Sequence, residues 1–364
     1  MKEAHVVYNF NAGPAILPQP VLEHVQQELR DYQGRGMSIM EMSHRSKEYE
    51  VINAEAEQRF KRLLRVGDSY RVLFMQGGAS TQFALVPMNF LAQGQTADYL
   101  LTGVWSEKAS EEAAKLGMVH IAGTTHEEHY CRIPRPEELK FSEQPAYVHM
   151  TTNNTIYGTQ WHALPEVGER PLVADMSSDI MSRPLAAEKF ALIYAGAQKN
   201  LGPAGVTVVL VRESWLATAP KTLQTMLRYA TYAKNNSLYN TPPVFAVYML
   251  NLVLQWLEAQ GGLTAMAERN QRKAAVLYAA IDQSHGFYRG HAAPDSRSLM
   301  NVTFRLPTEE LEKAFVSAAT DAGMVGLAGH RSVGGIRASL YNAQTLEACQ
   351  SLAYFMNDFA HAHG

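Results

Sequence analysis

Cysteine is scarce in this chain, and the scarcity limits the kinds of site that it can hold. Only Cys131 and Cys349 occur among 364 residues, far apart and without metal or redox spacing. The residues around Cys131 include several histidines, but these are irregularly spaced and interrupted by Glu127 and Glu128, which fits a solvated loop better than a metal site. We therefore predict no metal at this cluster, which comprises His120, His126, His129 and Cys131.

Excess positive charge and long apolar runs are also missing. The formal net charge is -3, so no global field attracts nucleic acid or an anionic membrane, and any basic site must be local. The longest apolar stretch, residues 242–256, contains Asn251 and Gln255 and is too short for a membrane span. Residues 1–5 lack the apolar region of a signal peptide. We expect a cytoplasmic protein with neither nucleic-acid nor membrane partners.

What the chain does have is a repeated alternation of strand and helix patterns. With 46% hydrophobic and 18% charged residues it can bury a large core. The alternation predicts an α/β fold with a mainly parallel sheet flanked by helices. We expect helices at 80–91 and 106–115. The expected strands are 71–76, 96–102, 146–151, 172–175, 192–195 and 206–211.

Helical patterns dominate residues 244–283 and are interrupted at Gly261 and Gly262. A strand, a helix, a second strand and a closing helix are then expected at 300–305, 308–322, 335–339 and 344–360. We place a domain boundary near Gly261. The predicted organisation is an N-terminal segment (1–15), a large domain (16–260) and a smaller α/β C-terminal domain (261–364).

Lys199 is the most informative residue, because it lies between two apolar strands. Desolvation favours the neutral, nucleophilic form of a lysine amine, so Lys199 has the character of a Schiff-base lysine. Small neighbours such as Gly196 and Gly202 leave room for a flat cofactor to approach the backbone. The competing interpretation is an ordinary surface lysine at a strand turn.

Three further features follow expected strands, and the carboxyl ends of strands are where ligands collect in an open α/β sheet. Residues 77–81, Gly-Gly-Ala-Ser-Thr, precede a helix and resemble a phosphate cup, although Ser80 could be an ordinary N-cap. Asp175 could pair with a protonated pyridinium nitrogen, or could simply start a turn. Trp105 could stack on a flat ring, or could be a core tryptophan.

Two His-Arg-Ser tripeptides, at residues 44–46 and 330–332, give the chain local cationic loops. A phosphate or a carboxylate is the expected guest of such loops, since the chain has no net positive charge to attract anions elsewhere. Exposed His-Arg pairs are nevertheless common, so the loops alone do not establish an anion site.

Taken together, these segments resemble the phosphoserine aminotransferase family, a class V branch of the fold type I pyridoxal-phosphate enzymes. The resemblance runs essentially end to end, and no position that carries chemistry departs from it. At Ser80 some relatives have arginine, so the substrate phosphate has one cation fewer. The segments that carry the resemblance are 10–15, 42–46, 77–82, 152–158, 174–178, 197–200, 240–243 and 329–343.

The resemblance implies a large domain with a seven-stranded sheet and a pyridoxal 5'-phosphate cofactor. Lys199 would carry the Schiff base and shuttle the proton, Asp175 would contact the pyridinium nitrogen, Trp105 would stack on the ring, and Thr155 would bond the cofactor hydroxyl. The cofactor phosphate would be held by Ala79, Ser80 and Gln198, joined by Asn240 and Thr241 from a second subunit of a homodimer.

For the substrate, the resemblance assigns the α-carboxylate to Arg337 as a bidentate fork, which lysine could not replace. The substrate phosphate would contact His330 and Arg331, with His44 and Arg45 supplied by the partner subunit. The implied reaction moves an amino group from L-glutamate to 3-phosphohydroxypyruvate and gives O-phospho-L-serine and 2-oxoglutarate. The related phosphorylated hydroxythreonine of pyridoxine synthesis is a further candidate substrate.

Three alternatives remain open at this point. A class V aminotransferase for a small unphosphorylated oxo acid would not need the two His-Arg pairs. A cysteine desulfurase would need a mobile nucleophilic cysteine, and neither Cys131 nor Cys349 lies in a sequence that resembles a flexible catalytic loop. A DNA-binding regulator on this fold would need an additional basic domain, and the sequence contains no such segment.

Overall fold

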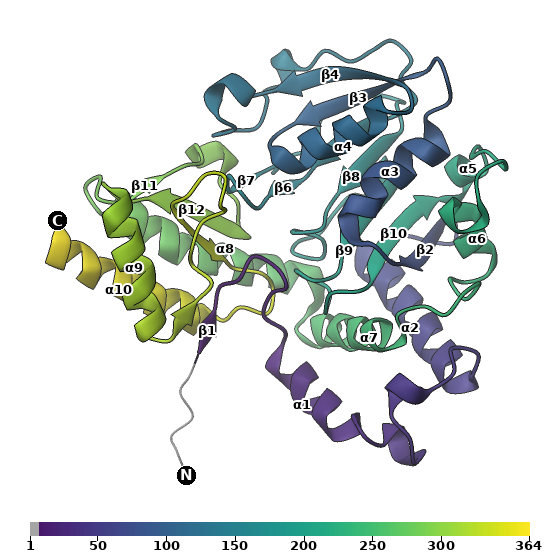
Figure 1. The fold of residues 1–364 in the computed structure, drawn as a ribbon, viewed down its shortest axis with the longest axis horizontal. Helices are drawn as coiled ribbons and strands as arrows, with labels where there is room; N and C mark the ends of the chain where they lie inside the picture. The colour runs from purple at the N-terminus through teal and green to yellow at the C-terminus, as the bar shows by residue number, and fades with distance from the viewer. Residues whose placement is uncertain (1–6) are drawn as a thin grey trace.

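A seven-stranded sheet forms the centre of the larger part of the molecule (Figure 1). The structure, a computed structural model, describes residues 7–364. The expected lack of a signal region at residues 1–5 therefore lies outside the described residues. Strand β10 runs antiparallel to both of its neighbours, and the other adjacent pairs are parallel. In spatial order the strands are β2 (Tyr70–Met75), β10 (Thr207–Arg212), β9 (Phe190–Gly196), β8 (Leu172–Asp175), β5 (Val148–Thr151), β3 (Thr96–Leu101) and β4 (Met118–Thr124).

Helices cover both faces of this sheet, because successive strand side chains point to opposite sides. In β9, Ile193 and Ala195 join the core beneath one helical layer, while Leu192 and Tyr194 join the core beneath the other. The first layer contains α1 (Gln19–Glu28), α2 (Lys47–Leu64) and α7 (Val244–Ala259). The second contains α3 (Gly78–Phe90), α4 (Val104–Ala114), α5 (Glu213–Leu216) and α6 (Tyr229–Lys234). The predicted α/β architecture is confirmed.

The C-terminal part has its own core around a small antiparallel sheet of β11 (Arg289–Gly290), β12 (Asn301–Arg305) and β14 (Ile336–Ser339). Its helices are α8 (Gly262–Asp282), α9 (Glu309–Asp321) and α10 (Leu346–His363). Helix α8 bridges the two cores, since Leu263 and Met266 pack in the large one while Ala274 and Leu277 pack in the small one. The boundary near Gly261 stays a prediction.

Short elements complete the chain. The N-terminal strand β1 (Tyr8–Asn9) pairs in parallel with β13 (Met324–Val325), so the first described residues pack with the C-terminal part. A second small pair joins β6 (Asn153–Asn154) to β7 (Thr159–Gln160). Single-turn 3-10 helices lie at Tyr32–Gly34, Ile39–Glu41, His126–Glu128, Pro136–Glu138, Ala187–Lys189, Thr225–Leu227 and Pro294–Ser296.

Strand β4 corrects one expectation from the sequence. The interpretation of His120 as part of a solvated loop is wrong, because His120 lies in this edge strand with its Nδ1 3.1 Å from Asp98 Oδ1. The strand lacks a clear alternating pattern, since Met118 and Ile121 are exposed and the two residues between them, Val119 and His120, are only partly buried. An edge strand covered by few neighbours does not need the alternation that identifies a buried strand.

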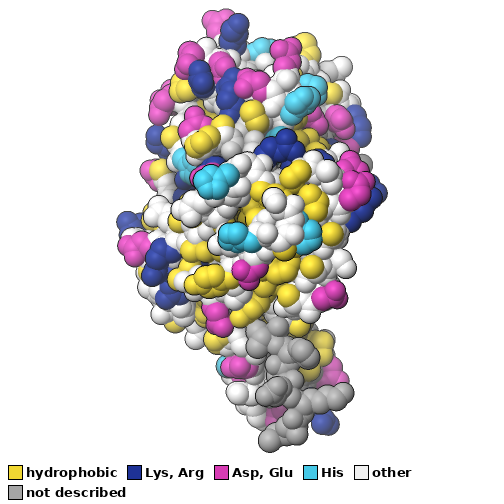
Figure 2. Space-filling view, turned by 90° about the vertical axis from the view of Figure 1, so that its left-hand side faces the viewer, with side chains coloured by type: hydrophobic (Ala, Val, Ile, Leu, Met, Phe, Trp, Pro, Cys, Tyr) yellow, Lys and Arg dark blue, Asp and Glu magenta, His cyan; other side chains and the backbone are white. Residues whose placement is uncertain are grey.

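One face of the molecule illustrates the weak net charge of the sequence (Figure 2). On the face shown in Figure 2, acidic and basic side chains are interspersed and do not gather into one basic patch. No helix within residues 7–364 combines the length and apolarity that a membrane span requires.

Candidate active site

Lys199 lies in the turn that joins β9 to β10, at the carboxyl end of the parallel strand β9. The N-terminal segment packs over this turn: Ala15 donates its N–H to the carbonyl of Gln198 at 2.9 Å, and a Cβ added to Gly13 would stand 3.3 Å from Lys199 Cγ. Burial lowers the pKa of Lys199, the charge of Asp175 opposes this shift, and that of Arg337 adds to it. The environment therefore favours a neutral amine more than water does.

Asp175 ends β8 and is held by a short hydrogen-bonded relay. Its Oδ1 accepts bonds from Ser177 N at 2.9 Å and from Ser177 Oγ at 2.6 Å, and that hydroxyl accepts a bond from Gly196 N at 3.0 Å. The hydrogen bonds among residues 7–364 leave Oδ2 without a protein partner. Burial raises the pKa of Asp175, while the Ser177 bonds and the Lys199 charge act against that rise. A buried carboxylate with one oxygen to spare is suited to a cationic partner.

Trp105, Thr155 and Arg337 form a connected wall beside the lysine. Trp105 begins the first turn of α4, its Nε1 donates to Thr155 Oγ1 at 3.2 Å, and Lys199 Nζ lies 5.9 Å from the centre of its ring. Arg337, on β14, donates from Nη1 to the Thr155 carbonyl at 3.2 Å. The structure thus brings together four residues from four separate segments of the chain. Arg337 comes from the C-terminal part, and Trp105, Thr155 and Lys199 come from the larger part.

The predicted phosphate cup lies in the first turn of α3. Gly77 precedes the helix with φ 93°, a left-handed conformation that glycine adopts without steric cost. Thr81 N donates to the Gly77 carbonyl at 3.4 Å, so the N–H groups of Gly78, Ala79 and Ser80 need partners from outside the helix. A Cβ on Gly196 would stand 3.7 Å from Ala79 N, which places this cup beside the end of β9.

The remaining predicted residues lie in loops, and the structure does not bring all of them to Lys199. His44 and Arg45 precede α2, where Arg45 is exposed. Asn240 and Thr241 precede α7, and the Thr241 carbonyl accepts a bond from Gln76 Nε2 at 3.3 Å. In a single chain these four residues are exposed or partly exposed, so a second subunit could contact them.

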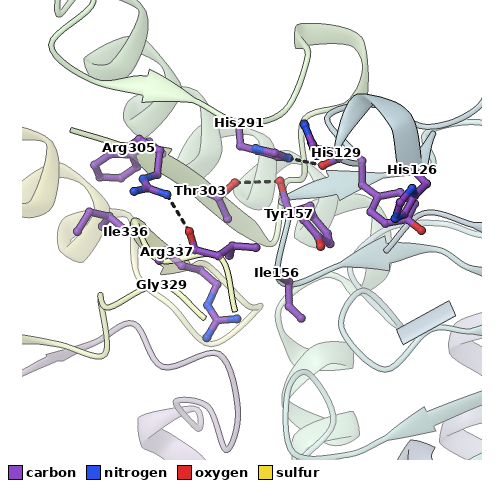
Figure 3. A pocket seen from close by; sticks show the side chains of 14 residues that line it. His126, His129, Ile156, Tyr157, His291, Thr303, Arg305, Gly329, Ile336 and Arg337 are labelled. Carbon is purple, nitrogen blue, oxygen red and sulfur yellow. Dashed lines mark hydrogen bonds between the residues drawn. The ribbon is translucent and has the colours of Figure 1, made fainter. Parts of the chain in front are cut away.

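A cavity of about 380 Å³ lies between the two parts of the molecule, next to Arg337 (Figure 3). Thr303 Oγ1 donates to the Tyr157 carbonyl at 2.9 Å across this seam, and His291 Nε2 lies 2.9 Å from the His129 carbonyl. Two arginines and three histidines line the cavity, and none of the described lining residues is acidic. His330 and Arg331 line an adjoining hollow on the other side of the loop 329–335.

Sequence reasoning missed Ser177 and Gly13, which shape the surroundings of Asp175 and Lys199. Ser177 could have been found, since it stands two residues after Asp175 in a segment already singled out, and a turn-starting aspartate commonly accepts a bond from the backbone N–H at that spacing. Gly13 offered no comparable signal, because its contact with Lys199 joins positions 186 apart in the chain. The desulfurase alternative loses support, since Cys349 is fully buried and burial raises its pKa to about 12.

A profile of the family described as aminotransferase class V matches residues 7–352. The chain belongs to this family. It is 65% identical over 358 residues to a phosphoserine aminotransferase of Herpetosiphon aurantiacus, covering 98% of this chain and 99% of that one. The solved structure of phosphoserine aminotransferase from Bacillus circulans subsp. alkalophilus is 56% identical, with a TM-score of 0.97 over 99% of this chain and 100% of that chain.

A more distant relative carries its cofactor. The structure of pyridoxal-phosphate-bound phosphoserine aminotransferase from Trichomonas vaginalis is 38% identical to this class V chain, with a TM-score of 0.92 over 97% of this chain and 100% of that chain. The predicted resemblance, fold and enzyme class are therefore confirmed. The individual site residues stay predictions, supported by the geometry described above.

Proposed function

We propose that the protein is a pyridoxal-phosphate-dependent transaminase that moves the amino group of L-glutamate to 3-phosphohydroxypyruvate and yields O-phospho-L-serine and 2-oxoglutarate. The observation that carries the proposal is the convergence at Lys199. The lysine lies 5.9 Å from the Trp105 ring and within the electrostatic reach of both Asp175 and Arg337. Relatives named phosphoserine aminotransferase, which match nearly the whole of this chain, support the proposal.

The residues present fit pyridoxal phosphate. Asp175 Oδ2 has no protein partner among the described residues and can face a ring nitrogen, and the first-turn amides of α3 can hold a phosphate. Lys199 would bond the cofactor covalently, Trp105 would stack on its ring, and Thr155 would bond its hydroxyl. When bound, the cofactor supplies the carbonyl that accepts the amino group and a ring that withdraws electrons from the reacting carbon.

The protein's own part is proton transfer and orientation. Because burial lowers the pKa of Lys199, its amine can be neutral and can take the proton from the substrate Cα. The same amine would then deliver a proton to the carbon of the cofactor. Arg337 is suited to hold the α-carboxylate by two parallel N–H bonds, since its Nε is buried without a partner among the described residues. A substrate held there lies beside both Lys199 and Trp105.

Recognition of the phosphate is assigned to His330 and Arg331, with His44 and Arg45 from a second subunit. Within one chain, the loop that carries His330 and Arg331 borders the Arg337 cavity through Gly329 and Val333. A two-fold dimer that shares its sites would add the second His-Arg pair, together with Asn240 and Thr241 at the cofactor phosphate.

A substrate panel tests the activity most directly. Phosphoserine, serine and alanine are compared as amino donors to 2-oxoglutarate. A preference for phosphoserine above about tenfold, or ~1.4 kcal/mol, supports the phosphate assignment. A smaller preference favours the alternative, an aminotransferase for a small unphosphorylated oxo acid. The phosphorylated hydroxythreonine belongs in the same panel, because its use and the cytoplasmic location stay predictions.

Mixed dimers test whether sites are shared. A Lys199→Ala subunit is combined with an Asn240→Ala, Thr241→Ala subunit, and each parent alone is expected to be poorly active. Shared sites regenerate one intact site in each heterodimer, so activity recovers on mixing. Fully active monomers in sedimentation, or no recovery in heterodimers shown to have formed, would contradict this arrangement.

A further inference from the structure

The loop of residues 329–335, which carries His330 and Arg331, has few contacts of its own to fix its shape. Gly334 and Gly335 have positive φ values of 70° and 74°, and Ser332 is exposed. Its internal bonds are mainly local, including Gly329 N to the Gly335 carbonyl at 2.8 Å and Gly334 N to the His330 carbonyl at 2.8 Å. These bonds close the loop but do not anchor it to the rest of the protein.

Two residues outside the loop supply that anchor. Arg305, on β12, donates from Nη1 to the Val333 carbonyl at 2.8 Å. Glu312, on α9, accepts a bond from Gly335 N at 3.1 Å through Oε2. The Arg305 guanidinium also donates from Nε to Glu312 Oε1. This ion pair therefore connects strand β12 and helix α9 to the C-terminal end of the loop.

Burial of Glu312 makes this ion pair sensitive to substitution, although the Arg305 side chain is 43% exposed. The Glu312 side chain is 9% exposed, and Oε1 also accepts a bond from Leu306 N at 3.3 Å. A buried carboxylate needs its partners, because removing one leaves a charge that water cannot reach. Gly335 packs closely against the pair, since a Cβ there would stand 2.6 Å from Arg305 Cδ.

We propose that Arg305 and Glu312 are positioning residues that set His330 and Arg331 for the substrate phosphate and so determine the preference for phosphorylated substrates. The inference rests on the proposed function, because it presumes that His330 and Arg331 contact that phosphate. Arg305 also lines the cavity beside Arg337, so the Arg305→Lys variant, which keeps that charge, and the Glu312→Gln variant test positioning rather than loss of a cation from the cavity. The pair acts by restricting the loop to one arrangement, which lowers the ordering cost of binding.

The α-carboxylate contact should be independent of this pair. Arg337 lies in the regular part of β14, where Thr303 and Arg337 are paired across to β12, and its own bond is to the Thr155 carbonyl. Loosening the loop should therefore weaken phosphate recognition while leaving carboxylate recognition in place. A general loss of stability would reduce both.

The test compares single-turnover reactions of the cofactor-loaded enzyme with phosphoserine and with L-alanine. Glu312→Gln removes the charge but keeps the side-chain size, and Arg305→Lys keeps the charge but loses the two-pronged geometry. We expect each to lower kcat/KM for phosphoserine about tenfold and to change that for alanine less than about twofold. Because the two residues act as one unit, kcat/KM for phosphoserine in the double variant should be no lower than in the less active of the two single variants. Glu310→Gln, on the same helix, is the matched control for the loss of charge.

Hydrogen exchange of residues 329–335 in the same proteins gives a readout other than activity, and faster exchange is expected in both variants but not in the control. If wild type prefers phosphoserine and both folded variants keep that preference, the positioning role is refuted. An equal loss for alanine refutes it in favour of a structural role. Should Glu312→Gln not fold, Arg305→Lys alone decides. A wild-type enzyme without the preference instead refutes the proposed function itself.

Discussion

Replacing Arg337 by lysine gives the sharpest test of carboxylate recognition. The guanidinium lies beside the cavity, donates once to the Thr155 carbonyl and keeps a buried Nε without a protein partner among the described residues. Lysine retains the charge but cannot make two parallel bonds to a carboxylate. Loss of such a contact costs about 2 to 5 kcal/mol, and the lower end applies because Arg337 is only partly buried and water can enter.

This cost corresponds to roughly a 30-fold or greater fall in kcat/KM, since every 1.4 kcal/mol is about tenfold. Every amino-acid substrate has an α-carboxylate, so phosphoserine, glutamate and alanine should lose similar factors in single-turnover assays. Thr303→Ser, which keeps the neighbouring hydroxyl on β12, serves as a control with near-normal rates. A loss confined to phosphoserine, or one below about threefold for all three substrates, would show that Arg337 does not hold the carboxylate.

Three further outcomes are expected. Lys199→Ala should remove nearly all transamination in a coupled 2-oxoglutarate assay, because the proton shuttle is lost, and wild-type-like turnover would exclude Lys199 as the catalytic amine. Arg331→Ala should reduce the preference for phosphoserine over alanine, whereas an unchanged ratio would place the phosphate elsewhere. Lys273→Met should flatten the rise of unfolding free energy with pH in urea titrations at pH 7.5 and 9.5. Burial lowers the pKa of Lys273 to about 7 in the folded protein, whereas the value in the unfolded chain is 10.5. Between these two values the unfolded chain binds one proton more than the folded protein, so the free energy of unfolding of the wild type rises with pH by up to ~1.4 kcal/mol per pH unit. An equal slope in the variant would contradict that assignment.

Buried strands were predictable from the sequence, and the exposed edge was not. Strand β8 matches its expected bounds of 172–175, β9 starts two residues earlier and ends one later than the expected 192–195, and β10 is shifted by one residue from the expected 206–211. All three lie in the centre of the sheet, where both faces require apolar side chains. Edge strand β4 meets no such requirement, and the two-residue strands β1 and β13 owe their pairing to contacts across more than 300 positions.

The candidate site divides in the same way. Lys199, Asp175 and Trp105 could be found because each follows an apolar strand, and topology brings such positions to one edge. The anchor formed by Arg305 and Glu312 gave no signal, since an arginine in a strand and a glutamate in a helix are ordinary surface residues until folding pairs them. Although the two residues stand only seven positions apart, folding rather than their local sequence brings them to the loop and buries Glu312.

Lys199 and Arg337 need different charge states for the proposed reaction, and their mutual electrostatic effect favours this difference. Two cations that approach the same substrate repel each other, and the charge of Arg337 lowers the pKa of Lys199 in addition to burial. This repulsion assists the reaction, because a lysine that takes a proton from carbon must first be neutral, while the arginine must keep its charge to hold the carboxylate. Asp175 acts in the opposite direction on the lysine, but its Oδ2 has no protein partner among the described residues and is available to a cationic cofactor ring in the proposed mechanism. Occupying that oxygen with a cationic ring would reduce its pull on Lys199, so the bound cofactor should favour the neutral amine whenever Lys199 is free to move a proton.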